Sequence, residues 1–318
     1  MEQFTKIRTR RVYFARRKYL TIGKMKAKIF EIKRFAVHDG DGIRTTVFFK
    51  GCPLKCVWCH NPEGISKNPE LAYFEHKCLS CGECLKVCPS NAHKIENGLH
   101  FFEREKCLAC GKCESVCLGN ALTLYGKEYT VSELIPILLK DKDFYDNSGG
   151  GVTLSGGECL LYADFCAELL KQLKERGVNT AVDTCGFVSK TALDKVIPFA
   201  DVFLYDIKAM SEEAHEKSTG RSNKNIIENL LYLDSKNCKI EIRIPYVPNF
   251  NDNEINFIGE FLSKLKNATK VRVLAYHNFA SSKYESLGIK NNLPNDLPSK
   301  TEIDKALKTL KSFGLNVV

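Results

Sequence analysis

The segment Gly51-Cys52-Pro53-Leu54-Lys55-Cys56-Val57-Trp58-Cys59-His60 directly follows an apolar run, Val47-Phe48-Phe49. It places three cysteines at C-x3-C-x2-C spacing in one short loop. Three thiolates from such a loop can bind three irons of a cubane and leave the fourth iron without a protein ligand. Structural zinc sites normally use four ligands in paired spacings, which this loop does not offer. The spacing therefore favours an iron–sulfur centre with one open iron over a zinc knuckle or an incidental group of thiols.

Short apolar or β-branched runs alternate with amphipathic stretches through the rest of the chain, as they do in βα units. Strands are predicted near residues 45–50, 152–155, 179–184, 202–207, 239–245 and 271–275. Six parallel strands, each followed by a helix, predict an α/β fold of the open or partial (β/α)6 barrel type. Its active site is expected at the carboxyl ends of the strands.

The same periodicity predicts two helices and the orientation of one strand. The two apolar helix faces consist of Leu161, Phe165, Leu169 and Leu173, and of Ile303, Leu307, Leu310 and Phe313. In the strand near 239–245, three isoleucines alternate with Lys239, Glu241 and Arg243. If the isoleucines pack under helices, Arg243 points to the opposite face, into the lumen of the barrel.

A cysteine-dense insert at about residues 76–122 separates two parts of the predicted barrel, residues 28–75 and 123–318. The run CLSCGECLKVC from Cys78 aligns with CLACGKCESVC from Cys107 at a shift of 29 residues. Each run has the spacing of bacterial ferredoxins, in which the fourth cysteine of one run ligates the other cluster. The pattern predicts two 4Fe–4S clusters, one on Cys78, Cys81, Cys84 and Cys117 and one on Cys107, Cys110, Cys113 and Cys88. Two structural zinc ions are the alternative.

The net charge of +9 in this 318-residue chain comes from its N-terminus. Residues 1–28 hold ten Lys or Arg and one acidic residue, so the other 290 balance at 37 basic and 37 acidic. We expect residues 1–27 to be a disordered extension, with Met25 as an alternative start, and we expect no nucleic-acid partner. No stretch approaches the roughly 18 apolar residues of a membrane span. Fifteen cysteines without an export signal predict metal ligands in a reducing cytoplasm rather than disulfides.

The cysteine triplet resembles that of the radical S-adenosylmethionine (SAM) superfamily. Two neighbouring segments narrow the resemblance to the activating enzymes of glycyl radical enzymes: Val37-His38-Asp39-Gly40-Asp41-Gly42-Ile43-Arg44-Thr45-Thr46 and Cys59-His60-Asn61-Pro62-Glu63. The resemblance runs from about residue 28 to the C-terminus. It departs from the family at Asp41, where proline is usual. It implies a SAM-binding cluster on the triplet, and it implies that Asp39 lies near the target glycine.

The resemblance also implies which residues bind SAM. Ser155-Gly156-Gly157-Glu158 is similar to the family's SGGE segment, whose backbone and carboxylate hold the amino group of the methionine part. Asp206 and Lys208 are expected to contact the ribose and carboxylate. The full implied set is Trp58, Cys59, His60, Gly156, Gly157, Glu158, Asp183, Asp206, Ile207, Lys208, Arg243 and His277. Asp39 and Lys208 join the three cysteines as expected catalytic residues. A monovalent-cation site would comprise Asp183, Thr184, the carbonyl of Leu204, and Asp206.

The implied reaction is reductive cleavage of SAM to a 5′-deoxyadenosyl radical, which abstracts a hydrogen atom from a glycine of a partner glycyl radical enzyme. A ferredoxin or flavodoxin is the expected electron donor, acting through the insert's clusters in the cytoplasm of an anaerobic organism. One alternative is a radical SAM enzyme that acts on a small molecule or a peptide. Another is a ferredoxin-like electron carrier, which would not turn over SAM.

Overall fold

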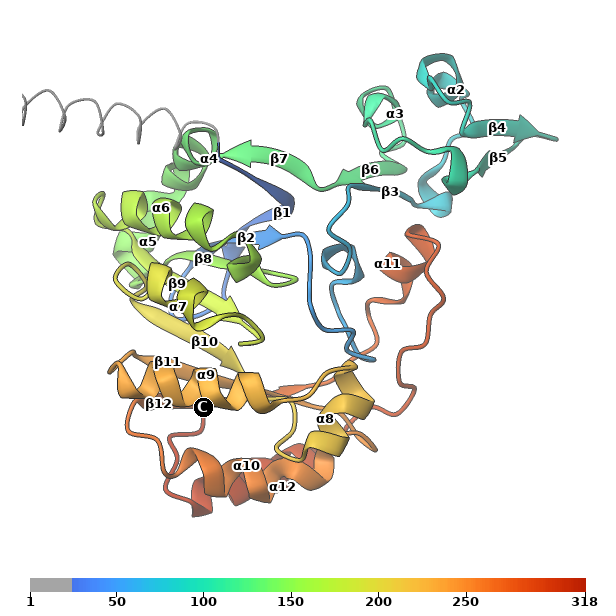
Figure 1. The fold of residues 1–318 in the computed structure, drawn as a ribbon. Coiled ribbons are helices and arrows are strands. Elements are labelled where there is room, and N and C mark those ends of the chain that lie inside the picture. The colour runs from blue at the N-terminus through green and yellow to red at the C-terminus, as the bar shows by residue number, and fades with distance from the viewer. Residues whose placement is uncertain (1–24) are drawn as a thin grey trace, which may run out of the picture.

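The computed structural model describes residues 25–318, which form an α/β fold on one eight-stranded, mostly parallel sheet (Figure 1). The strands are β1 (Lys26–Ala36), β2 (Arg44–Phe49), β7 (Lys127–Thr130), β8 (Gly151–Gly156), β9 (Asn179–Thr184), β10 (Val202–Asp206), β11 (Ile240–Tyr246) and β12 (Ala268–Ala275). Their order is β12-β11-β10-β9-β8-β2-β1-β7. From β2 to β12 the neighbours are parallel, so their carboxyl ends meet at one edge. These are the six predicted strands, and the prediction is confirmed.

Two strands that were not predicted extend the sheet beyond β2. β1 pairs antiparallel with both β2 and β7. Lys26 pairs with Thr130, and Ala27 is completely buried. The folded part of the chain therefore begins before residue 28, where we had expected it to start. The rest of the predicted N-terminal extension, residues 1–24, lies outside the described residues.

The helices outside the insert are α4 (Val131–Leu138), α5 (Lys142–Ser148), α6 (Ala163–Lys174), α7 (Lys190–Val196), α8 (Glu212–Thr219), α9 (Lys224–Ser235), α10 (Ile255–Leu262), α11 (Ser281–Ser286) and α12 (Lys300–Ser312). All of them except α8 and α11 contribute side chains to one large hydrophobic core. As expected for β11, Ile240, Ile242 and Ile244 are completely buried in this core. Since successive side chains of a strand point to opposite faces, Arg243 projects away from the helices.

The two predicted apolar helix faces are confirmed except at their ends. Phe165, Leu169 and Leu173 of α6 are buried. Leu161 is 38% exposed and lies before the helix, in the 3-10 turn Cys159–Tyr162. The cause is the side chain of Glu158, which caps this tighter turn and delays the start of α6 to Ala163. Phe313 is the C-cap residue of α12 rather than a residue of its last turn.

The cysteine-dense insert forms a small unit that stands apart from the sheet at the upper right of Figure 1. Strand β3 (Glu70–Tyr73) pairs with β6 (Leu122–Tyr125), and β4 (His93–Glu96) pairs with β5 (Leu99–Phe102). Two short helices, α2 (Glu83–Val87) and α3 (Lys112–Ser115), each follow a glycine in the left-handed conformation. These glycines, Gly82 and Gly111, have φ angles of 77° and 75°. The sequence repeat is therefore also a repeat of backbone conformation.

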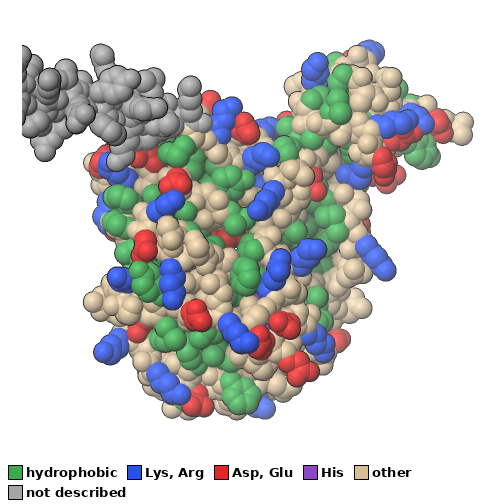
Figure 2. Space-filling view, in the orientation of Figure 1, with side chains coloured by type: hydrophobic (Ala, Val, Ile, Leu, Met, Phe, Trp, Pro, Cys, Tyr) green, Lys and Arg blue, Asp and Glu red, His purple; other side chains and the backbone are tan. Residues whose placement is uncertain are grey.

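The described surface has a mixed charge. Figure 2 shows lysine and arginine side chains interspersed with acidic ones over the visible face. This agrees with the balanced charge of the chain outside its N-terminus. Within residues 25–318, the helices are too short or too polar to span a lipid bilayer.

Candidate active site

A cavity of about 240 Å³ lies at the carboxyl edge of the parallel strands. Its wall is formed by the cysteine loop after β2 and by residues at or just beyond the ends of β8 to β12. It gathers most of the predicted site residues: Cys52, Cys56, Trp58, Cys59, His60, Gly156, Gly157, Asp183, Thr184, Asp206, Lys208 and Arg243. Side chains from distant parts of the sequence meet here because parallel strands end at a common edge.

The start of the cysteine loop is held by close backbone contacts. Cys52 N donates a hydrogen bond to Ile65 O at 3.0 Å. A Cβ on Gly157 would lie 2.3 Å from the carbonyl oxygens of both Gly51 and Gly64. Only glycine permits so close an approach of two backbone segments. Gly157 therefore packs against the backbone at the start of the cysteine loop and also lines the cavity.

The short helix α11 fixes the other end of the loop. Lys283 Nζ lies 2.6 Å from Glu63 Oε1 and donates to His60 O at 3.2 Å. Tyr284 OH donates to Cys59 O at 3.0 Å. Neither residue was predicted, because a lysine and a tyrosine on a short helix carry no spacing signal. The C-terminal segment thus positions the three cysteines.

The three loop thiols lie in a largely buried setting. Burial raises the pKa of Cys56 to about 11 and that of Cys59 to about 12. A hydrogen bond with the thiol of Cys185, to which the sequence assigned no role, lowers the pKa of Cys52. Cysteines lose their protons on metal binding, and thiolates select iron–sulfur clusters over hard cations such as Mg²⁺. The donor set therefore fits the SAM-binding cluster that the family implies.

Charged side chains from the strand ends line the same cavity. Lys208 Nζ lies 2.7 Å from Asp206 Oδ2, and Arg243 Nη1 lies 3.2 Å from Asp183 Oδ2. Burial acts to lower the pKa of Lys208, but the carboxylate of Asp206 outweighs it and raises this pKa, so the ammonium stays charged. Burial raises the pKa of Asp183 to about 6, against the opposing effect of Arg243. Two cations and two carboxyl groups can together bind a zwitterion that also carries hydroxyl groups.

Glu158 is not among the residues that line the cavity, and its expected contact with the amino group of SAM stays a prediction. The residue is 1% exposed. Its oxygens accept hydrogen bonds from Leu160 N at 3.0 Å, Thr184 Oγ1 at 2.8 Å and Cys185 N at 3.0 Å. Through these contacts Glu158 joins the ends of β8 and β9. The backbone of Gly156 and Gly157 remains on the cavity wall.

The residues of the predicted monovalent-cation site make contacts within the protein, and the site itself stays a prediction. Thr184 Oγ1 donates to Glu158 and accepts from Gly186 N at 3.0 Å. Its hydroxyl is thereby directed into the protein. Leu204 pairs with Asp183 in the sheet, while a second cavity, at the amino ends of the strands, includes Leu204 in its wall.

Asp39, Ile207 and His277 lie beside the cavity rather than on its wall. Asp39 Oδ2 accepts a hydrogen bond from a threonine of β2, and its Oδ1 lies 3.9 Å from Arg243 Nη2. The ring of His277 stacks on that of His60 with 4.0 Å between centroids. Ile207 is buried. These residues contact the wall from behind, and their contacts with SAM stay predictions.

The eight cysteines of the insert line two further cavities. One contains Cys78, Cys81, Cys84 and Cys117, and the other contains Cys88, Cys107, Cys110 and Cys113. These are the two crossed sets that the ferredoxin pattern predicts. Backbone N–H groups donate to sulfur in both cavities: Ser80 to Cys78 and Ala121 to Cys117 in the first, Ala109 to Cys107 and Ala92 to Cys88 in the second. Such donors stabilise iron-bound thiolates, so each cavity fits one 4Fe–4S cluster.

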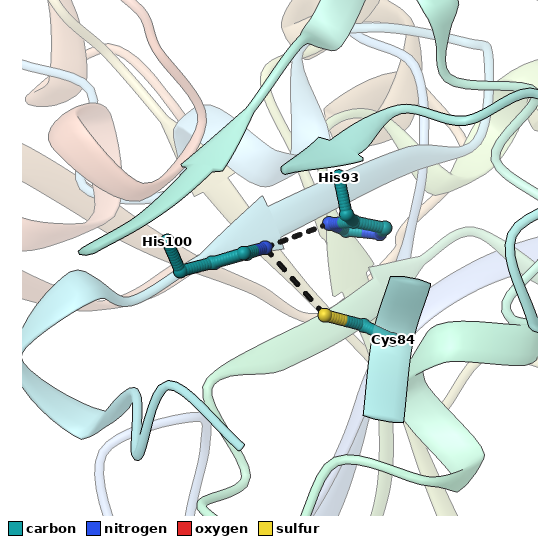
Figure 3. A group of neighbouring side chains, drawn as sticks. All are labelled: Cys84, His93 and His100. Atoms are coloured by element: carbon teal, nitrogen blue, oxygen red, sulfur yellow. Dashed lines mark hydrogen bonds between the residues drawn. The ribbon is translucent and has the colours of Figure 1, made fainter. Parts of the chain in front are cut away.

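Two buried histidines lie beside Cys84 (Figure 3). His100 lines the first cavity and His93 lines the second. His93 Nδ1 lies 3.0 Å from His100 Nε2, which lies 3.5 Å from Cys84 Sγ. Burial, followed by the effect of His100, lowers the pKa of His93 to about 4, and burial lowers the pKa of His100. The histidines were not predicted, because they stand outside the cysteine runs and meet only when β4 pairs with β5.

Comparison with known proteins finds relatives that match most of this chain. The family model of the radical SAM superfamily matches residues 46–262. The choline trimethylamine-lyase activating enzyme of Oleidesulfovibrio alaskensis is 41% identical over 271 residues, which cover 83% of this chain and 87% of that protein. The trans-4-hydroxy-L-proline dehydratase activating enzyme of Clostridioides difficile is 42% identical, with coverage of 83% and 88%. The benzylsuccinate synthase activating enzyme of Thauera aromatica is 37% identical, with coverage of 91% of each chain. The chain therefore belongs to the radical SAM superfamily, and within it to the activating enzymes of glycyl radical enzymes.

Proposed function

We propose that this protein reductively cleaves SAM and uses the resulting 5′-deoxyadenosyl radical to abstract a hydrogen atom from a glycine of a partner glycyl radical enzyme. The observation that carries the proposal is the single cavity shared by the three loop cysteines and the charged pair Asp206 and Lys208. For this reaction, the three metal-binding cysteines and the groups that bind the polar ligand must face the same cavity.

The residues of the cavity divide into metal ligands and ligand-binding groups. Cys52, Cys56 and Cys59 would hold three irons of a 4Fe–4S cluster. When bound, the cluster supplies the electron that breaks a carbon–sulfur bond of SAM, giving methionine and the 5′-deoxyadenosyl radical. Lys208 and Arg243 would bind the carboxylate of SAM, and Asp206 would accept hydrogen bonds from its ribose. The amino group would meet the backbone of Gly156 and Gly157, which lie on the cavity wall.

An apolar part of the wall would protect the radical from side reactions. Trp58, Val247 and Tyr276 pack together, line the cavity and are at most 6% exposed. Such a surface excludes water from a reactive intermediate. The radical takes one hydrogen atom from the partner's glycine Cα, which leaves 5′-deoxyadenosine here and a glycyl radical on the partner. Asp39, next to Arg243, is the residue expected nearest the incoming glycine loop.

We further propose that the insert is a ferredoxin-like domain in a partial (β/α)6 barrel, carrying two 4Fe–4S clusters. Support comes from the two four-cysteine cavities and from N–H···S hydrogen bonds at equivalent positions of the two repeats. The clusters would pass electrons from a reduced ferredoxin or flavodoxin to the SAM-binding cluster, in the cytoplasm of an anaerobic organism. This role suits clusters whose four ligands leave no open iron.

The test is anaerobic incubation of the reconstituted, reduced protein with SAM and candidate glycyl radical enzymes, read by electron paramagnetic resonance (EPR). Cys56→Ala is the test variant. Cys238→Ala is its matched control, because Cys238 is half-buried and lies outside the three cavities. We expect a glycine-centred doublet on one candidate with the native protein and Cys238→Ala, and none with Cys56→Ala.

The alternatives predict different products. Formation of 5′-deoxyadenosine without a doublet on any candidate would favour a radical enzyme that acts on a small molecule or a peptide. Absence of SAM cleavage by reduced protein that holds all its iron would favour an electron carrier. Native protein loaded with zinc in place of iron would contradict the proposal altogether.

A further inference from the structure

The buried residues His93 and His100, drawn with Cys84 in Figure 3, each line one of the two four-cysteine cavities of the insert. We propose that His100 donates its Nε2–H to Cys84 Sγ and thereby raises the reduction potential of the cluster on Cys78, Cys81, Cys84 and Cys117. In this arrangement His93 is a positioning residue that keeps His100 in the donating tautomer. The inference rests on the proposed two-cluster insert and adds a residue that tunes one of its clusters.

The two imidazoles are held in fixed positions. They are 4% and 8% exposed, and their rings stack with 5.1 Å between centroids and 25° between planes. The ring of Phe102 stacks on His93 at 5.0 Å, and the ring of Tyr73 meets His100 edge-on at 4.7 Å. Burial and these aromatic contacts restrict the rotation of both imidazoles. The 3.5 Å contact between His100 Nε2 and Cys84 Sγ is therefore fixed by the packing of the insert.

The number of N–H protons on the two imidazoles determines which ring nitrogen donates the hydrogen bond. Each neutral imidazole carries one N–H, and the 3.0 Å contact between the rings needs one proton between His93 Nδ1 and His100 Nε2. If His93 supplied it, His100 would carry its proton on Nδ1, which is buried and has no partner. An unsatisfied buried N–H is costly. With the proton on His100 Nε2 instead, the N–H faces both His93 Nδ1 and Cys84 Sγ.

An iron-bound Cys84 would strengthen this choice. A thiol could give its own proton to His100, but a thiolate ligand can only accept. Hydrogen bonds to cluster sulfurs stabilise the more negative, reduced state and so raise the reduction potential. The imidazole therefore acts on the cluster through a ligand sulfur, without itself binding iron.

The histidines break the symmetry between the repeats. Each cavity receives two backbone N–H···S hydrogen bonds from equivalent positions, 29 residues apart. At the same shift His93 corresponds to Leu122 and His100 to Tyr129, so the second repeat has no histidine at these positions. His93 does line the second cavity, but its ring nitrogen contacts His100 and not a cysteine of that cavity. There a hydroxyl, Ser90 Oγ, lies 3.6 Å from Cys88 Sγ. The imidazole contact is thus an addition to one cluster and not a consequence of the repeat.

The first test is an EPR-monitored redox titration of the reconstituted holoenzyme. His100→Leu removes the donor, His100→Gln retains an N–H donor, and His76→Leu is the matched control, an exposed histidine of the same insert. We expect the reduction potential of one insert cluster to become more negative in His100→Leu. In His100→Gln, which keeps an N–H donor, we expect that potential to lie close to the native value. His76→Leu should leave all potentials unchanged. An unchanged potential in His100→Leu, with iron content preserved, would overturn the inference.

A second test uses the native protein and so does not depend on the folding of variants. Protein labelled with ¹⁵N only in histidine is reduced, and the insert clusters are studied by pulsed EPR. We expect a weak ¹⁵N coupling, as from a nitrogen one hydrogen bond away from a ligand sulfur. Absence of coupling, or a strong coupling from a nitrogen bound to iron, would overturn the inference.

The iron content of the protein tests the proposed two-cluster insert separately from the proposed role of His100. About twelve irons per chain, from three cubanes of four, indicate that the two-cluster insert is correct. The potential and the ¹⁵N coupling then decide the role of His100. About four irons would contradict the two-cluster insert itself. About eight irons with one further metal ion on Cys84, His93 and His100 would mean that the three side chains form a separate metal site, and would overturn the inference.

Discussion

Arg243 Nη1 lies 3.2 Å from Asp183 Oδ2, and both side chains are on the wall of the active-site cavity. The same carboxylate oxygen accepts a hydrogen bond from Ser155 Oγ at 2.7 Å. Asp206 and Asp39 add further negative charge near the guanidinium, which raises the pKa of Arg243 although burial opposes this. The arginine thus connects carboxylates from separate parts of the chain, and its charge offsets their mutual repulsion.

Replacing Arg243 with methionine should strongly destabilise the fold. Several partly buried carboxylates would lose their common cation, and such losses cost about 3–5 kcal/mol of unfolding free energy. Arg176→Met is the matched control, because Arg176 is exposed and an exposed substitution changes stability by about 0.5 kcal/mol or less. Chemical denaturation of both variants measures the difference. Equal effects in the two variants would contradict the assigned role of Arg243.

The unfolding free energy of the native protein should depend on pH through Asp183, and Asp183→Asn should lack this dependence. Burial raises its pKa from the ordinary 3.8 to about 6, so the folded state binds this proton more tightly than the unfolded chain. The resulting stabilisation is complete below about pH 4 and is lost as the pH rises through 6. Relative to Asp183→Asn, the native protein should therefore gain about 1–3 kcal/mol of unfolding free energy between pH 7 and pH 4. A constant difference across that range would show that Asp183 is ionised throughout.

Pairs of cysteine substitutions test the proposed crossed ligation of two clusters in the insert. Cys78 and Cys117 line one cavity, whereas Cys88 lines the other. The double variant Cys78→Ala/Cys117→Ala should lose about four irons, since both residues serve one cluster. Cys78→Ala/Cys88→Ala should lose about eight irons, because each residue serves a different cluster. Iron analysis after identical reconstitution measures both, and the reverse result would mean that each repeat binds its own cluster.

Adding a methyl group to Gly157 should displace the cysteine loop. The new Cβ would clash with the carbonyl oxygens of Gly51 and Gly64, each 2.3 Å away. Gly157→Ala should therefore lose about four irons, those of the SAM-binding cluster, and with them SAM cleavage. Gly177→Ala is the control: its Cβ meets open space, and its left-handed backbone at φ +71° costs only about 1–2 kcal/mol. Full iron content in Gly157→Ala would show that the loop can shift without losing its ligand geometry.

Much of the fold and the grouping of the cysteines could be predicted from the sequence, because periodicity and spacing are local properties of a chain. Alternating Ile240, Ile242 and Ile244 predicted a strand with one buried face, and the structure buries all three. The 29-residue repeat predicted which cysteines share a cavity. Antiparallel β1 was missed because its polar residues, such as Lys33 and Arg34, hide the alternation on which strand prediction depends.

The orientation of individual side chains was decided only by the tertiary structure. Glu158 was expected in the cavity, but hydrogen-bond donors from β9, a neighbour in space and not in sequence, turn its carboxylate inward. Lys283 reaches the cysteine loop across more than two hundred residues. His93 and His100 meet only through the pairing of β4 with β5. The sequence thus determined the parallel strands and the grouping of the cysteines, whose patterns are local. Only the packed structure decided which polar groups satisfy one another, since that depends on neighbours brought together by folding.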